Sequence, residues 1–132
     1  MIDGDTLDIQ GQRIRIWGVD APESRQLCSR ATGEYRCGQV AANQLDHWIA
    51  SRPVTCVEDS RDRYRRTVAR CAVGGQDIGG WLVRRGYALR YPEYAGSAYL
   101  LEEFSARRQR AGVWSGAFDY PWDWRRARRV SP

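Results

Sequence analysis

Hydrophobic and polar residues alternate over the first twenty positions, which is typical of strands with one buried face. Two turn residues, Gln10-Gly11, interrupt the alternation. We therefore predict a hairpin formed by residues 5–10 and 13–19, with one face packed on a core. The apolar positions that carry this pattern are Leu7, Ile9, Ile14 and Ile16.

The second of these strands begins with a cation, Arg15, and ends in two carboxylates, Asp20 and Glu23. An unpaired carboxylate at the edge of a core is costly, so a compensating charge is expected, and a hard cation with oxygen ligands is the first candidate. Pro22 restricts the backbone between the two acids and fixes their relative orientation. Strict alternation would place Arg15 and Asp20 on opposite faces, so we predict that the strand bulges or stops near Gly18.

Apolar residues at helical spacing mark three further segments. The predicted helices are residues 39–50, 78–85 and 97–112. Gly86 would stop the second helix and Ser97 would cap the third, in which we expect Leu100, Leu101 and Phe104 to face inward. His47 lies between the apolar positions of the first helix, so a surface position is more probable than a role as catalytic base.

Residues 54–58 and 67–73 are predicted strands, joined by the arginine-rich segment 59–66. Residues 24–37 are predicted to be a polar loop, and residues 113–132 show little periodicity. This order of elements favours an α+β fold built on a five-stranded Greek-key barrel of the OB type, with about three α-helices. We expect one domain, residues 1–132, with a basic aromatic tail over residues 115–132.

The composition limits the kinds of molecule that this chain is expected to bind. The chain has 132 residues, and no apolar run approaches the ~20 residues of a membrane span, so we expect no membrane partner. All 21 cationic residues are arginine, and the net charge is +5. Arginine can hold a phosphate with two parallel hydrogen bonds. The excess of positive charge indicates a polyanionic partner, although a basic surface that is simply solvated would give the same net charge.

Four cysteines occur without a CxxC pair, which argues against a zinc site. Three disulfide connectivities are possible. Cys56 and Cys71 flank the predicted hairpin, so we pair them, and Cys28 is left with Cys37. Bridges would require an oxidising compartment, yet residues 1–4 do not resemble a signal peptide. Either a leader has been removed or the thiols are free; we expect a secreted or periplasmic protein.

Several short motifs together resemble the staphylococcal nuclease (thermonuclease) family. Each is weak alone, but their order and spacing cover nearly the whole chain. The motifs are Asp3-Gly4-Asp5-Thr6, Arg15 to Glu23, Asp62-Arg63-Tyr64-Arg65-Arg66, Leu82-Val83-Arg84-Arg85-Gly86 and Gly112-Val113-Trp114. The resemblance implies an OB barrel with three helices and a calcium-dependent phosphodiesterase that acts on DNA and RNA.

The resemblance also implies roles for individual residues. Asp5 and Asp20 would be the carboxylate ligands of Ca²⁺, with the carbonyl of Ala21 as a main-chain ligand. Glu23 would position or deprotonate the attacking water. Catalytic phosphate contacts would come from Arg15 and Arg66, and further substrate contacts from Arg63, Tyr91 and Tyr94.

Three departures from the family pattern matter. Ala21 replaces the usual threonine, which a main-chain ligand tolerates. Arg65 occupies a position where glycine is common, and a positive φ there would cost roughly 1 kcal/mol and could re-aim Arg66. The family's first strand precedes the Asp3-Gly4-Asp5-Thr6 turn, so we expect a truncated first strand.

Two functions therefore remain open. The first is a metal-dependent endonuclease of low sequence specificity, monomeric and without an obligate protein partner, whose substrate is DNA, RNA or both. The second is a non-catalytic OB module that binds nucleic acid or a protein. The joint presence of the acidic and basic residues favours the enzyme. The tryptophans of segment 122–129 could stack bases, or they could dock on the barrel.

Overall fold

The computed structural model describes residues 3–128, and its largest element is a sheet with the strand order β1-β2-β7-β6, to which β8 adds by pairing with β7. Neighbouring strands are antiparallel except β2 and β7, which run parallel. The strands are β1 (Thr6–Ile9), β2 (Gln12–Ile16), β6 (Val54–Arg61), β7 (Thr67–Val73) and β8 (Gln76–Asp77). The predicted hairpin is confirmed, and its turn residues Gln10 and Gly11 both have positive φ, as tight hairpin turns require.

Within residues 3–128 these strands do not close into a barrel, because β1 and β6 each have a single neighbour in the sheet. The predicted α+β class is confirmed, and the main sheet has five strands, but the predicted Greek-key barrel is corrected to an open mixed sheet. The cause lies at Gly18, whose φ of 79° turns the chain away from the sheet after β2. The next strand, β3 (Val19–Asp20), then pairs with β9 (Leu89–Arg90) in a separate two-stranded sheet.

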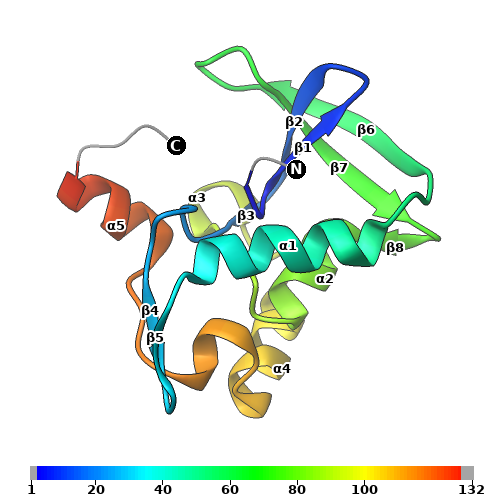
Figure 1. The fold of residues 1–132 in the computed structure, drawn as a ribbon. Coiled ribbons are helices and arrows are strands. Elements are labelled where there is room, and N and C mark those ends of the chain that lie inside the picture. The colour runs from blue at the N-terminus through cyan, green and yellow to red at the C-terminus, as the bar shows by residue number, and fades with distance from the viewer. Residues whose placement is uncertain (1–2, 129–132) are drawn as a thin grey trace.

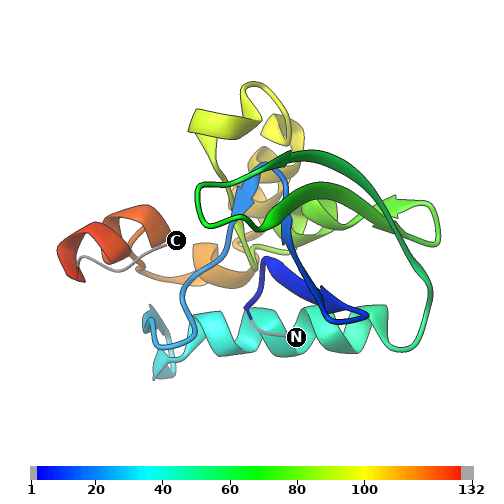
Figure 2. The ribbon, with the colours of Figure 1, turned by 90° about the horizontal axis from the view of Figure 1, so that it is seen from above.

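Five α-helices lie within the described residues, instead of about three. They are α1 (Cys37–Ile49), α2 (Ile78–Arg84), α3 (Pro92–Ala95), α4 (Leu100–Gln109) and α5 (Pro121–Arg128), with a 3₁₀ helix η1 (Gly112–Ser115) before the last. The first two confirm the predicted segments within two residues, and His47 is exposed as expected. Figures 1 and 2 show the main sheet on one side of β3 and α5 on the other.

The main core lies between the sheet and the helices α1 and α2. Leu7 and Ile16 from the sheet pack with Leu45 of α1 and Leu82 of α2, all of them almost fully buried. A second, smaller cluster gathers Leu89 and both cysteines of one disulfide around η1. β3 and β9 therefore lie between the two hydrophobic clusters. Packing on both sides fixes the charged residues that these two strands carry.

The third predicted helix, residues 97–112, is present but is shorter and begins later than expected. Tyr99 adopts a left-handed conformation with φ 67°, so α4 begins at Leu100 and Ser97 is not its cap. Leu100, Leu101 and Phe104 are then 50%, 82% and 60% exposed, and do not face the core. The buried residue of this helix is Ala106.

Two segments predicted to be irregular contain regular structure. The polar loop of residues 24–37 holds a small hairpin, β4 (Cys28–Arg30) and β5 (Gly33–Tyr35). The tail contains η1 and α5; its residues 129–132 lie outside the described part of the chain. No helix within residues 3–128 is long and apolar enough to cross a membrane.

Both predicted disulfides are present. Cys28 joins Cys37, which ties the small hairpin to the start of α1, with 5.6 Å between the Cα atoms. Cys56 joins Cys71 across the β6–β7 pair, where the two residues lie directly opposite each other. The described chain has no free cysteine.

Candidate active site

Arg15 links two buried carboxylates at the end of the β1–β2 hairpin. Its Nη1 lies 2.8 Å from Oδ2 of Asp5, and its Nη2 lies 3.5 Å from Oδ1 of Asp20. The hairpin register pairs Thr6 with Arg15, which brings Asp5 alongside. The turn at Gly18 then returns the chain, so the predicted stop in the strand is what lets Arg15 and Asp20 converge.

Asp5 is held as a carboxylate by its partners. Oδ1 accepts a hydrogen bond from the Thr6 hydroxyl at 3.1 Å, and Oδ2 accepts one from the Ala21 amide at 2.8 Å. Burial pushes the pKa of Asp5 up, but the charge of Arg15 and these hydrogen bonds outweigh it and hold the pKa below its usual range. Asp5 is therefore ionised at any pH at which the protein would work.

At Asp20, which is only 1% exposed, the effects of burial and of the neighbouring charges on the pKa combine differently. Burial raises the pKa of Asp20 to about 6, despite hydrogen bonds from Arg125. Both carboxylate oxygens accept from this arginine of α5: Nη1 donates to Oδ1 at 2.9 Å and Nη2 to Oδ2 at 2.6 Å. This parallel pair of bonds is the strongest arrangement that an arginine and a carboxylate can make.

Glu23 shares the same arginine, since its Oε1 lies 3.3 Å from Nη1 of Arg125. Burial raises the pKa of Glu23 above its ordinary value, and the charge of Arg125 counters only part of this effect. The backbone of Glu23 rests on the first turn of α1. A Cβ on Gly38 would lie 1.9 Å from the carbonyl oxygen of Glu23, so only glycine permits this approach.

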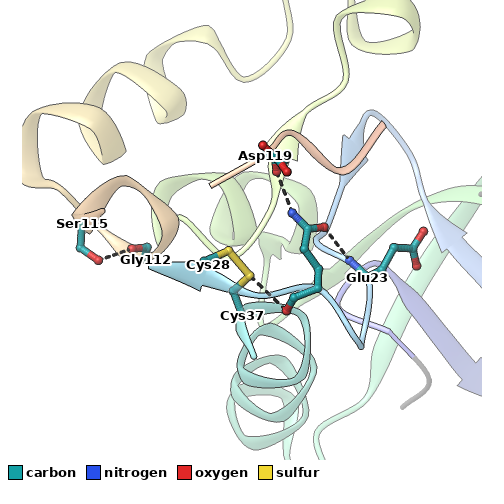
Figure 3. Close-up of a disulfide and its surroundings, with 7 residues drawn as sticks. Glu23, Cys28, Cys37, Gly112, Ser115 and Asp119 are labelled. Carbon is teal, nitrogen blue, oxygen red and sulfur yellow. Dashed lines mark hydrogen bonds between the residues drawn. A yellow bond between two sulfur atoms is a disulfide. The ribbon is translucent and has the colours of Figure 1, made fainter. Parts of the chain in front are cut away.

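The segment before α5 is docked beside the carboxylates. The carboxamide of Gln26, which is fully buried, donates to the Asp119 carbonyl at 2.7 Å and accepts from the Glu23 amide at 3.2 Å (Figure 3). Trp122 stacks on Tyr91 and on Tyr120, with ring centroids 5.1 Å and 4.9 Å apart. The tail tryptophans therefore dock on the protein, which was one of the two expectations for this segment.

Beside the carboxylates lies a cleft of about 460 Å³. Its walls contain Arg15 and all of the predicted phosphate and substrate residues outside the acidic set, namely Arg63, Arg66, Tyr91 and Tyr94. Tyr94 is 63% exposed at the rim. The cleft is therefore lined by arginine and tyrosine, together with Asp59, Asp62 and Glu93, and Arg15 is the residue that joins it to Asp5 and Asp20.

Arg66 lies in the cleft wall but is bound by its own loop. Its Nε is 2.6 Å from Oδ2 of Asp62, and its amide donates to Oδ1 of the same residue at 2.9 Å. Arg65, at the position where glycine is common, has a φ of 65°, so the strain expected there is present. The loop closes around Asp62, whose carboxylate accepts these bonds.

The oxygen donors at this site suit a hard cation in kind, because Asp5, Asp20 and the carbonyl of Ala21 are oxygen ligands. Their arrangement does not fit one. Arg125 takes both oxygens of Asp20, and Arg15 with the Ala21 amide takes Oδ2 of Asp5. In the described part of the chain, no three Asp, Glu, His or Cys side chains are grouped so that they could hold a metal ion.

Sequence reasoning missed Arg125 as a site residue. It appeared only within the basic tail, whose arginines could grip phosphate or lie in water, whereas its side chain is 6% exposed. A signal was available: Asp5, Asp20 and Glu23 carry three negative charges, and Arg15 supplies one positive charge. The expected compensating charge was a metal ion, but an arginine from a distant part of the chain can supply it as well, and Arg125 does so.

Comparison with known proteins gives independent findings. The family model described as "Staphylococcal nuclease homologue" matches residues 13–116. The "Succinoglycan biosynthesis protein ExoI" of Rhizobium meliloti (strain 1021) is 39% identical over 117 residues, which cover 86% of this chain and 61% of that protein. The chain thus spans about three fifths of the length of that relative.

Two other relatives are covered more fully. A protein named "Uncharacterized endonuclease" from Escherichia coli O157:H7 is 32% identical over 132 residues, covering 95% of this chain and 80% of that protein. The "Micrococcal nuclease" of Shigella flexneri is 35% identical over 144 residues, covering 96% of this chain and 78% of that protein.

Proposed function

The chain belongs to the staphylococcal nuclease family, and from that membership we propose that it is an endonuclease that hydrolyses phosphodiester bonds of DNA, RNA or both. The observation that carries this proposal is the position of Arg15, which borders the arginine- and tyrosine-lined cleft and also contacts Asp5 and Asp20. A phosphate in the cleft would lie next to buried acids, which is where hydrolysis needs it. Contacts to phosphates, and few to bases, would give low sequence specificity.

In this mechanism Arg15 and Arg66 hold the phosphate, and their hydrogen bonds strengthen as negative charge develops on its oxygens. Arg66 would exchange its bond to Asp62 for the phosphate, since both bind the same guanidinium. Glu23 accepts the proton of the attacking water, and its raised pKa makes it a better base near neutral pH. Arg63, Tyr91 and Tyr94 bind flanking parts of the strand.

We also propose that Ca²⁺ is required, with Asp5, Asp20 and Ala21 as its ligands. The family and the kind of oxygen donors support this part of the proposal. The contacts of Asp20 with Arg125 do not fit a bound cation, so no step of the mechanism is assigned to the ion. The two disulfides support export to an oxidising compartment, secreted or periplasmic.

A second candidate function has an observation of its own. Arg125 already satisfies Asp20 and Glu23, and Asp62 already satisfies Arg66. A module that only binds nucleic acid or a protein could keep such internal pairs permanently. It would use the cleft for binding and would leave the acids paired.

Incubation of the protein with single-stranded DNA in Ca²⁺, and then in chelator, separates the two functions. The nuclease gives cleavage in Ca²⁺ that chelator abolishes. Cleavage that persists in chelator would keep the nuclease and remove the cation from it. Binding without cleavage in both conditions would replace the nuclease with the binding module.

A further inference from the structure

Arg125 occupies the oxygens that a cation at this site would need. Its two Nη atoms lie 2.9 Å and 2.6 Å from the two oxygens of Asp20, and Nη1 also lies 3.3 Å from Glu23. A guanidinium bound in this way uses both oxygens of the carboxylate in its own plane. The residue is 5% exposed, so this is a buried contact and not a surface ion pair.

We propose that Arg125 competes with a divalent cation for Asp20, so that the cation binds only when this guanidinium leaves the carboxylate. The inference rests on the proposed cation-dependent nuclease and adds a residue that regulates its site. It assigns to α5 a function in setting cation affinity, in addition to its packing.

The charges of the site support competition. Asp5, Asp20 and Glu23 contribute three negative charges, and Arg15 and Arg125 contribute two positive ones. Successive ion pairs connect these side chains into one network, from Asp5 through Arg15, Asp20 and Arg125 to Glu23. Adding a divalent cation to this network would leave it with excess positive charge. Without Arg125, the same cation would balance the network.

The way in which α5 is anchored also supports the proposal. Trp122, which stacks on Tyr91 and Tyr120, and the buried Trp124 anchor the part of the helix that directly precedes Arg125. The guanidinium is therefore held near Asp20 at a high effective concentration. The proposal requires only this side chain to leave the carboxylate, while the packing of the two tryptophans stays in place.

Isothermal titration calorimetry with Ca²⁺ tests the competition directly, without any nuclease assay. Arg125→Gln removes the positive charge, and we expect its affinity for Ca²⁺ to exceed that of the unmodified chain by about tenfold or more, the change that ~1.4 kcal/mol produces. Arg126→Gln is the matched control, because Arg126 is on the same helix, pairs with Asp123 and has a side chain that is 78% exposed. Its affinity should stay at the wild-type value.

A second variant covers the case in which Arg125→Gln fails to fold. Arg125→Lys keeps the charge, but its ammonium is a single point donor and cannot hold both oxygens of Asp20 as a guanidinium does. We expect a gain in Ca²⁺ affinity of a few fold, smaller than that of Arg125→Gln. Thermal unfolding without metal identifies which variants are folded.

Unchanged or weaker Ca²⁺ binding in both variants would overturn the proposal, since Arg125 would then hold Asp20 in place for the cation or have no effect. Absence of Ca²⁺ binding in every variant would overturn the proposed competition as well. In that case, cleavage in the presence of chelator would still support the proposed nuclease activity. Tighter Ca²⁺ binding in a variant, with no cleavage by the unmodified chain, would support the competition and contradict the nuclease.

Discussion

Asp5 and Asp20 are both buried and both touch Arg15, yet their proton affinities are shifted in opposite directions. Burial disfavours both carboxylates, but Asp5 also accepts bonds from the Ala21 amide and the Thr6 hydroxyl, and its pKa falls. In Asp20 burial dominates over Arg125, and its pKa rises to about 6. The charge of Arg15, followed by the Ala21 amide and the Thr6 hydroxyl, therefore outweighs burial at Asp5, whereas at Asp20 burial outweighs the contacts with Arg125 and Arg15.

Glu23→Gln and Arg66→Ala are each expected to reduce turnover by about 10²–10³, because each removes one group that acts on the phosphate or the water. Both side chains are partly exposed, at 21% and 19%, so the fold should survive. Cleavage rate measured beside circular dichroism checks both points. Glu34→Gln, an exposed acid on the small hairpin, is the control. Near-normal turnover in either variant would remove that residue from the mechanism.

The acid limb of the pH–rate profile is a second expectation for Glu23. A base acts when deprotonated, so activity is present above its pKa and is lost as the pH falls through it. Since burial raises the pKa of Glu23, the inflection should lie above the ordinary glutamate pKa of 4.5. Cleavage rates measured between acid and neutral pH give its position. An inflection at or below that value would mean that another group limits the rate.

The sequence predicted the meeting of Arg15 with Asp20 because the cause is local, a glycine that stops a strand between them. It could not predict the bond from Arg125 to Asp20, because these residues are 105 positions apart and only the tertiary fold joins them. Arg66 lies between these cases. Its loop was predicted over residues 59–66, although β6 continues to Arg61, and the cost of a positive φ at Arg65 was weighed only as a condition. The bond to Asp62 follows from how the loop closes.

The first turn of α1 and the Glu23 loop form one unit, since Gly38 leaves room for the Glu23 carbonyl. Gly38→Ala would place a methyl group 1.9 Å from that oxygen, and the loop would have to move. We expect a loss of stability of about 1–3 kcal/mol, as overpacking typically costs. The displaced Glu23 should also lower turnover.

Thermal unfolding and cleavage rate measure the two effects of Gly38→Ala. Asn43→Ala, on the exposed side of the same helix, should change neither by much and serves as the comparison. An unfolding temperature of Gly38→Ala equal to wild type would show that the loop adapts without cost, and the coupling between α1 and Glu23 would be disproved.

Helices were predictable where their apolar positions repeat, as in α1 and α2. Two of the differences from the predicted helices, in α4 and α5, have clear physical reasons. In α4 the left-handed Tyr99 sets the start of the helix, and its Oη donates to Oδ2 of Asp77 at 2.6 Å, a contact between distant segments. In α5 Trp124 and Arg125 are buried next to each other, and a buried arginine hides the apolar pattern.

Across the molecule, every cation outside the single histidine is an arginine, and the proposed phosphate contacts Arg15, Arg63 and Arg66 border one cleft. Three neutralised phosphates should give a slope of about −2 in log affinity against log salt for single strands. Fluorescence titration of a non-cleavable oligonucleotide at several salt concentrations measures it.

Arg63→Gln should make that slope shallower by about 0.7, because one phosphate contact is lost. Arg110→Gln, an arginine at the end of α4 outside the cleft wall, should leave the slope unchanged. A slope near zero in the unmodified chain would mean that phosphates do not dominate binding, and the proposed cleft contacts would then be wrong.

The residue that neutralises Asp20 is carried by α5, 105 positions further along the chain, so the charge balance of the acidic cluster is complete only when α5 docks. The described segment up to α4 already contains the strands of all three sheets and all four cysteines, but not Arg125, the partner of Asp20 and Glu23. Such long-range pairs form slowly, since the intervening chain must first be ordered. Until α5 docks during folding, these acids therefore have only Arg15 and the cations of the surrounding solution to balance their charge.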